Sequence, residues 1–201
     1  MRSIDLSLLQ GNVMHLHKML FAAAAMLPLI SCSKGSCPPT AACEAGVLLQ
    51  EDFETENNHL YALNYTGFAR WTVVKGTVDL VGTPPFDDFL PREQGMYVDL
   101  DGTSKAAGTL RSRERFTLVP GRYRLSLVLS GTPRPNQPPN TVIISVGDAF
   151  RESVTLPSYA PLRPLVRVFR VRSRMDAYLT FEHLGGDDYG IFIDDIRFER
   201  L

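Results

Sequence analysis

Short strand-like segments recur from Val47 to the C-terminus, and they constrain the fold of this sequence more than any other feature. Each is rich in β-branched or aromatic residues, and turn-forming residues separate it from the next. No segment of this region carries a convincing helical spacing of apolar residues. The segments are residues 47–54, 68–75, 77–81, 96–100, 109–118, 122–129, 141–146, 150–156, 165–171, 177–183 and 190–198. The pattern predicts an all-β fold, a two-sheet antiparallel jelly-roll β-sandwich whose first and last strands lie together.

Turn residues predict how some of these segments connect. Gly76 predicts a hairpin between residues 68–75 and 77–81, and Pro120-Gly121 predicts a turn that leads into residues 122–129. Side chains alternate across a strand, so one face of this last segment should be uniformly apolar. That face carries Tyr123, Leu125, Leu127 and Leu129.

The composition is that of an ordinary globular protein. The chain has 201 residues, a net charge of −1, 44% hydrophobic and 21% charged residues. A charge so close to neutral argues against a general nucleic-acid binder. The second half is rich in arginine, and these arginines alternate with apolar residues or lie beside turns, which favours the solvent-exposed face of a sheet over a polyanion groove.

The N-terminal region has the features of an export signal. Residues 19–30 form an apolar run that is too short to span a bilayer but suits the hydrophobic part of a signal peptide. The run ends in Leu29-Ile30-Ser31-Cys32, which resembles a bacterial lipobox. This resemblance implies a signal peptide over residues 1–31, with Met14 as an alternative start, and acylation of Cys32. The alternative is a plain secretion signal with an incidental cysteine.

Residues 32–46 are rich in small residues and proline, which predicts a flexible tether before a domain at residues 47–201. The chain has three cysteines, and lipidation of Cys32 would leave Cys37 and Cys43 to form an optional disulfide. Ser33 follows the lipidated position, which favours the outer membrane or the cell surface. We therefore expect an exported protein that is anchored in the cell envelope through lipid alone.

The last predicted strand contains a carboxylate that needs a partner. In a regular strand, Phe192, Asp194, Ile196 and Phe198 would share one face. An unpaired carboxylate among large apolar groups would cost several kcal/mol or would take up a proton. A bound cation is one candidate partner for Asp194, with co-ligands from residues 50–54.

The order of several short motifs along the chain resembles the galactose-binding-domain-like jelly rolls. These include carbohydrate-binding modules and the DUF642-like domains of exported bacterial proteins. The motifs are residues 71–80, 97–102, 108–110, 118–125 and 193–196. The resemblance implies a structural calcium ion between the first and last strands. Its expected ligands are Glu54 with Asp194 or Asp195, and Glu51 or Asp52 as substitutes. The alternative is that Asp194 pairs with an arginine and the glutamates are solvated.

Candidate ligand-binding residues lie in and after the loop of residues 82–95. Sugars are held by aromatic faces together with carboxylates and arginines, and long loops on sandwiches often carry binding groups. Tyr97, Asp99 and Asp101 alternate with apolar residues and should line a polar groove. The main candidates are Trp71, Phe86, Asp87, Phe89, Arg92, Tyr97, Asp99 and Asp101, and Arg134 and Asn136 in the second proline-rich loop are weaker ones. The alternative is that the aromatic residues belong to the core, and a lone tryptophan within a strand is usually buried.

An enzyme is the competing class of protein. The only histidines of the expected domain are His59 and His183, and no hydrolase or zinc-protease motif surrounds them. Glycosidases need two carboxylates, but the adjacent pairs of this chain lie in loops or on opposite faces of a strand. We therefore expect a binding domain for glycan or another surface polymer, without catalysis. The alternative is a structural or protein-interaction module of the envelope.

Overall fold

The computed structural model describes residues 46–85, 95–134 and 136–201. Within these ranges the chain forms β-strands and one short 3-10 segment, η1 (Glu56–His59). No helix in these ranges is long and apolar enough to cross a membrane. The predicted signal peptide, Cys32, the Cys37–Cys43 disulfide and the loop residues Phe86, Asp87, Phe89 and Arg92 lie outside the described residues.

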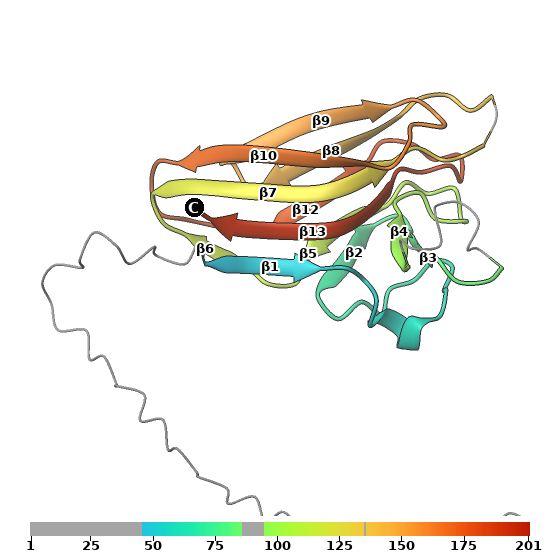
Figure 1. Ribbon diagram of the computed structural model, residues 1–201, viewed down its shortest axis with the longest axis horizontal. Coiled ribbons are helices and arrows are strands. Elements are labelled where there is room, and N and C mark those ends of the chain that lie inside the picture. Colours follow the sequence, from blue (N-terminus) through green and yellow to red (C-terminus); the bar gives the residue numbers. More distant parts are fainter. Residues whose placement is uncertain (1–45, 86–94, 135) are drawn as a thin grey trace, which may run out of the picture. The chain divides into compact units, whose positions relative to one another are not determined.

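The strands form two antiparallel sheets that pack face to face (Figure 1), which confirms the predicted β-sandwich. The first sheet has the order β10-β7-β13-β4-β3, with β1 also paired to β13. Its strands are β1 (Val47–Glu51), β3 (Asp79–Val81), β4 (Tyr97–Asp99), β7 (Gly121–Ser130), β10 (Arg163–Val171) and β13 (Phe192–Arg200).

The second sheet has the order β2-β5-β12-β8-β9. Its strands are β2 (Trp71–Lys75), β5 (Thr109–Ser112), β8 (Asn140–Val146), β9 (Phe150–Leu156) and β12 (Leu179–His183). A separate pair consists of β6 (Phe116–Leu118) and β11 (Met175–Ala177). The predicted strand 109–118 is thus two strands, β5 and β6, which pair with different partners.

One apolar core fills the space between the sheets. The alternating residues of β7 are all buried, as predicted, and β8 and β12 contribute the facing side chains. Burial of each such side chain stabilises the fold by about 1.5–3 kcal/mol. The β7 residues are Tyr123, Leu125, Leu127 and Leu129, and the facing ones include Ile144 and Phe181.

The predicted hairpin between β2 and β3 is wrong. β2 pairs with β5 in the second sheet, whereas β3 pairs with β4 in the first. The chain passes between the sheets just after β2, where Gly76 adopts a positive φ of 60°. A side chain at Gly76 would collide with the backbone carbonyl of Ala107. The glycine therefore serves a crossing between sheets, which its sequence signal does not distinguish from a hairpin turn.

The first and last strands are neighbours, as predicted. β1 runs antiparallel to β13, with Glu51 opposite Ile196, and the Arg200 N–H donates to the carbonyl of Gly46 at 3.0 Å. β7 lies on the other side of β13, so the closing strand is held along both edges. The entry point of the domain and its C-terminus are therefore side by side.

The last strand is not regular, and the predicted shared face of Asp194 and Phe198 is wrong. The register shifts between Asp194 and Arg197, and Asp195 has a positive φ of 49°. This β-bulge inserts one residue and moves the following side chains to the other face. Phe192 and Asp194 consequently lie on the outer face of the sheet, whereas Ile196 and Phe198 join the core.

Candidate functional site

A pocket of about 130 Å³ opens on the outer face of the first sheet, where β3, β4 and β13 meet the loops at one end of the sandwich. It combines carboxylates, hydroxyls, one guanidinium and apolar side chains, and we call it the aspartate pocket. Its lining residues are Leu63, Asp79, Val81, Asp99, Thr103, Thr132, Arg134, Asp188 and Phe192.

Strand register brings the central carboxylates together. Asp99 of β4 lies opposite Asp79 of β3 on one side and opposite Phe192 of β13 on the other. Residues in register on neighbouring strands share a face, so all three side chains point to the outer surface of the sheet. Beside them, Phe192 packs with Val81 and Tyr97 in a small apolar cluster separate from the main core.

Asp79 is fixed by three hydrogen bonds. Its Oδ1 accepts from the backbone N–H of Asn64 at 2.7 Å. Its Oδ2 accepts from the N–H of Thr103 at 3.1 Å and from the hydroxyl of the same residue at 2.5 Å. Because these donors come from loops before β3 and after β4, the carboxylate also holds both loops against the sheet.

Asp99 accepts fewer hydrogen bonds than Asp79 and is more deeply buried than Asp188. Its Oδ1 accepts from the backbone N–H of Asp101 at 3.0 Å. Burial, together with the negative charges of Asp79 and Asp101, raises the pKa of Asp99 well above its usual range. The chain passes close behind this carboxylate at Gly190, where a side chain would collide with Asp99 Oδ1. A carboxyl group with a raised pKa that lines a pocket is a candidate for a functional role.

The rim of the pocket carries charges that are more exposed. Arg134 lies over the ring of Tyr189, with 5.2 Å from its guanidinium carbon to the ring centroid. Asp188 is 4.0 Å from the ammonium group of Lys105. The rim therefore offers both a hydrogen-bond donor with positive charge and an acceptor with negative charge.

A buried pair, His183 and Asp101, holds the loop that supplies part of this rim. The side chains of both residues are fully buried, with 3.8 Å between His183 Nδ1 and Asp101 Oδ2. The Gly185 N–H donates to His183 Nδ1 at 3.1 Å, and the Asp187 N–H donates to Asp101 Oδ2 at 3.0 Å. Because His183 Nδ1 accepts a hydrogen bond, the ring is neutral. Burial lowers the pKa of His183, against the opposing effect of the Asp101 and Asp187 carboxylates.

Of the main ligand-binding candidates predicted from the sequence and described by the structure, Asp99 alone lines the pocket. Trp71 was a candidate to stack on a ligand, and this is wrong: its side chain is 0% exposed and packs against Phe53 and Phe181. The ring of Tyr97, 1% exposed, also cannot stack on a ligand. Asp101 lies beside His183 rather than in a shared groove.

Several pocket residues were missed in the sequence. Asp188 follows a Gly-Gly-Asp turn, which is a weak signal of a functional loop. Arg134, in a proline-rich loop, was a weaker candidate from the sequence, and it does line the pocket. Asp79 and Phe192 carry no sequence signal of a binding site, because only the pairing of β3, β4 and β13 places them together. The loop of residues 82–95 begins next to Val81, which lines the pocket.

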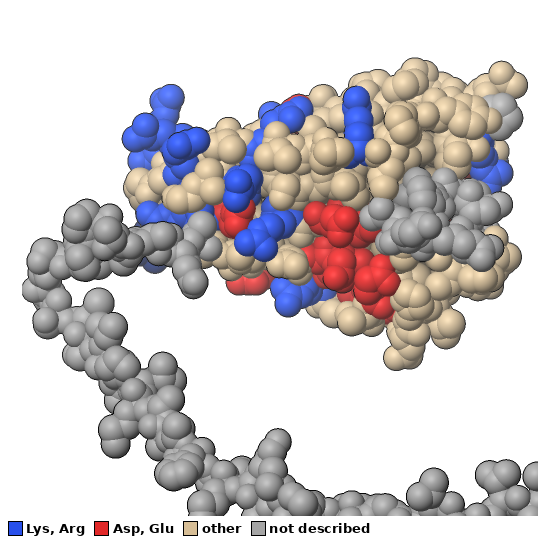
Figure 2. Space-filling view, in the orientation of Figure 1, with Lys and Arg blue, Asp and Glu red and all other residues tan. Residues whose placement is uncertain are grey.

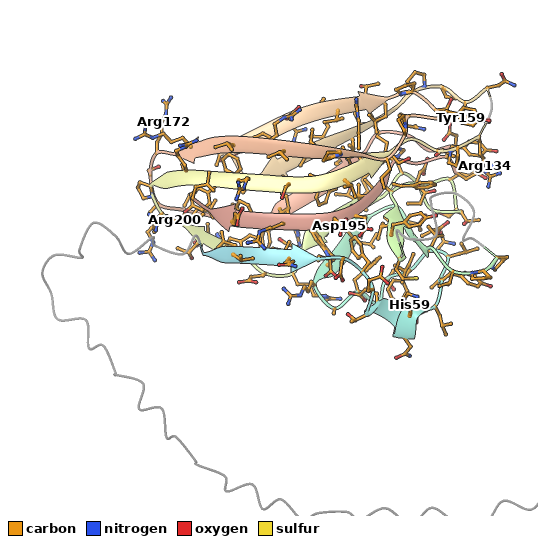
Figure 3. All side chains as sticks on the ribbon, viewed as in Figure 1. His59, Arg134, Tyr159, Arg172, Asp195 and Arg200 are labelled. Carbon is orange, nitrogen blue, oxygen red and sulfur yellow. The ribbon has the colours of Figure 1, made fainter. Side chains whose placement is uncertain are left out.

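The predicted calcium ligands partly meet in a second hollow, which we call the β1–β13 hollow. It is lined by Gln50, Glu51, Asp52, Ser126, Asp195, Ile196 and Arg197. Figure 2 shows acidic side chains gathered there, and Figure 3 shows Asp195 beside the end of β1. Burial raises the pKa of Glu51, and the charges of Glu56 and Asp52 add to the effect. Such oxygens suit a hard cation, although Arg197 lies on the same wall.

The remaining predicted calcium ligands have other partners. Glu54 does not line this hollow: its Oε1 accepts from the Met96 N–H at 2.7 Å, and its Oε2 is 3.2 Å from His59 Nδ1. Asp194 Oδ1 accepts from the Asp195 N–H at 2.7 Å. Among the described residues, no group of three or more His, Cys, Asp or Glu side chains is arranged to hold a metal ion. Calcium binding therefore stays a prediction, with Glu51, Asp52 and Asp195 as the ligands nearest to one another.

No protein-family model matches the sequence, and no curated protein matches it. Solved structures share the β-sandwich at low similarity. The enzymatically active domain of tailspike protein 4 from bacteriophage CBA120 has 14% identity and a TM-score of 0.47, over 69% of this chain and 20% of that chain. The K3 adhesin domain of Lys-gingipain from Porphyromonas gingivalis has 16% identity and a TM-score of 0.46, over 77% and 99%. The TmCBM61 structure, in complex with β-1,4-galactotriose, has 19% identity and a TM-score of 0.44, over 75% and 95%. At these values the likenesses carry no argument about function.

Proposed function

We propose that this protein is an exported, lipid-anchored binding protein whose β-sandwich domain recognises a carbohydrate or another cell-surface polymer in the aspartate pocket. The observation that supports the binding role is the pocket itself. It joins acceptors, donors and an apolar wall in one concave site, which is the usual composition of a small-molecule site.

The chemistry of the pocket suits a polyol. Sugar hydroxyls both donate and accept hydrogen bonds, and the pocket offers the carboxylates of Asp99 and Asp188 as acceptors and Arg134 as a donor. Phe192 supplies an apolar surface for the C–H face of a sugar ring. A volume of about 130 Å³ is below the common range for ligand pockets, so we expect one terminal sugar unit to enter.

Asp99 should contribute to the free energy of ligand binding. Its carboxylate is costly while it is buried with few donors, because a buried charge needs hydrogen bonds to offset its lost solvation. A ligand hydroxyl that donates to Asp99 would supply one of these bonds. The expected result is a free energy of binding that depends strongly on this residue.

Glycan-array binding by the full chain tests this proposal. Asp99→Asn and Arg134→Ala should each lower the affinity at least tenfold, because each removes a charged hydrogen-bond partner. Asp148→Asn is the matched control, since Asp148 is an exposed turn residue that does not line the pocket. A blank array, together with co-purification of an envelope protein, would instead support the structural module.

The absence of catalysis is also part of the proposal. Turnover of aryl glycosides by the full chain, lost in Asp99→Asn or in Asp79→Asn, would show that the pocket cleaves rather than binds. The lipid anchor has its own test, because a Cys32→Ser variant should no longer incorporate labelled fatty acid.

A further inference from the structure

Five arginines gather at the end of the sandwich opposite the aspartate pocket. β7 and β13 each join the two ends, since β7 begins at Gly121 and ends at Ser130 while β13 begins at the pocket residue Phe192 and ends at Arg200. The separation is roughly 25 Å along β13. Figure 3 shows Arg172 and Arg200 at this end and Arg134 at the other. We call it the arginine end, and its members are Arg122, Arg170, Arg172, Arg174 and Arg200.

These arginines have no carboxylate partners among the described residues. Some arginines elsewhere on the domain do have them: Arg124 and Arg197 both bind Glu199, and Arg167 binds Glu152. At the arginine end, Arg200 donates to the backbone carbonyl of Pro120 at 3.3 Å. Positive charge is therefore concentrated there without an ion pair to a described acidic side chain, in a chain whose net charge is only −1.

Two of the arginines flank a surface hollow with apolar walls. Arg122 of β7 lies opposite Arg170 of β10 in the sheet register. With Val168 and Phe169 they line a hollow of about 410 Å³, and Val168 is 48% exposed. Like charges directly opposite each other destabilise a sheet, so an anion between them would relieve the repulsion. An anionic group that continues into an apolar chain fits both the guanidinium groups and the exposed valine.

The chain enters the domain at this same end. Gly46 accepts a hydrogen bond from Arg200, and Arg122 accepts one from Leu201, so these backbone segments are in contact. Cys32 lies 14 residues before Gly46, which bounds its distance from the arginine end to roughly 50 Å when the chain is fully extended. Any surface that holds Cys32 is thus within reach of the five arginines.

We propose that the arginine end docks on an anionic phospholipid surface, with headgroup phosphates at Arg122 and Arg170. This inference rests on the lipid-anchoring part of the proposed function, because the anchor brings the surface to this end. The occupant is a membrane rather than a soluble polyanion, since the tether delivers the arginines to a membrane and Val168 is exposed between them. The aspartate pocket then faces away from the membrane, where a cell-surface ligand can reach it.

Vesicle co-flotation of the full chain tests the proposal. Vesicles of phosphatidylcholine with about one third phosphatidylglycerol are compared with pure phosphatidylcholine vesicles, so that insertion of the N-terminal apolar segment is common to both. Each arginine near an anionic surface is worth roughly a fivefold gain in affinity. Arg122→Gln with Arg170→Gln should therefore lower the affinity for the anionic vesicles by about 25-fold, and 0.5 M salt should reduce the wild-type preference to a similar degree.

The matched control removes two positive charges elsewhere. Lys75→Gln with Arg163→Gln changes the net charge equally, and Arg163 lies at the other end of β10. This control should keep the wild-type preference for anionic vesicles, and circular dichroism should show both double variants folded. Equal loss in both double variants would overturn the proposal, because a general charge effect needs no docking end.

Two further outcomes separate this proposal from the proposed function. Unchanged fatty-acid labelling in the Cys32→Ser variant would contradict the lipid anchor of the proposed function. The docking proposal would then be decided by the dependence of vesicle binding on Arg122 and Arg170, which is measured independently of the labelling. Stronger binding of a soluble anionic polysaccharide than of anionic vesicles, with the same dependence on Arg122 and Arg170, would overturn the membrane as the occupant. Glycan binding at the aspartate pocket should stay unchanged in the Arg122→Gln, Arg170→Gln variant.

Discussion

The two ends of the sandwich carry opposite charges, and they hold these charges in different ways. At the pocket end, the carboxylates of Asp79 and Asp101 accept hydrogen bonds from loop backbone, so the charges fix the local structure. At the arginine end, Arg122 and Arg170 extend from regular strands without ionic partners among the described residues. A change to a pocket carboxylate should therefore alter structure and binding together, whereas a change to an arginine should alter only what the surface attracts.

The largest expected difference between the ends is in the loss of stability when a glycine is replaced by alanine. Gly190→Ala places a methyl group against Asp99 Oδ1 and the Asp101 backbone, which cannot move without breaking the pocket. We expect the free energy of unfolding to fall by about 3 kcal/mol in urea titrations. Gly121→Ala is the counterpart at the arginine end, where the nearest atom is Arg200 Nε at 3.1 Å, and that flexible side chain can give way. A similar loss in both variants would contradict the comparison.

Calcium removal tests a site that lies on neither end. If Glu51, Asp52 and Asp195 hold calcium in the β1–β13 hollow, dialysis against EGTA should lower the melting temperature by roughly 5–10 °C. Added calcium should restore it, and Asp195→Asn should abolish the response. A melting curve that EGTA leaves unchanged would contradict the calcium prediction.

The buried His183 should make the pocket end sensitive to acid. In the folded protein its pKa lies below the ordinary value of 6.5, so the unfolded chain takes up a proton that the folded chain excludes. Stability from this group is present above pH 6.5 and is lost as the pH falls from 6.5 toward 5, by on the order of 1 kcal/mol. Urea titrations at pH 7.5 and 5.0 should show a smaller difference for His183→Gln.

The contribution of Asp99 to stability should change with pH in the opposite direction to that of His183. A carboxyl with a raised folded pKa contributes stability below its unfolded pKa and loses it as the pH rises through the folded value. Asp99→Asn should therefore stabilise the free protein near neutral pH by ~1 kcal/mol while it weakens ligand binding. A stable variant with full binding would show that the buried charge has no role in the pocket.

The smallest expected effect is at the arginine end. Arg122→Gln removes one member of a like-charged cross-strand pair, so it should raise the free energy of unfolding by a few tenths of a kcal/mol at low salt. The gain should vanish in 0.5 M salt because exposed charges are screened. A loss of stability would mean that Arg122 has a structural partner.

The sequence predicted the sandwich because its fold class depends on local patterns, and it predicted the paired ends from the jelly-roll topology that this class implied. Alternation placed Tyr123 and Leu127 in the core, and the short spacing of strand-like segments predicted the fold class. It also predicted the neighbouring first and last strands, which β1 and β13 confirm.

The sequence could not predict features that depend on register. The bulge at Asp195 changes the face of every following residue in β13, and no composition signal marks it. The pocket joins Asp79, Asp99 and Phe192 from three strands whose pairing order is not their order in the chain. The burial of Trp71 instead matches the alternative given from the sequence, because a lone tryptophan within a strand is usually buried.

The antiparallel pairing of β1 with β13 has a mechanical consequence. If a ligand pulls at the pocket end while the tether holds Val47, the force runs along the strands and not across them. The hydrogen bonds of an antiparallel pair lie perpendicular to the strands, so those between β1 and β13 would share the load and resist sliding together. The pairing of β1 with β13 is thus suited to stay closed if the proposed anchor comes under tension.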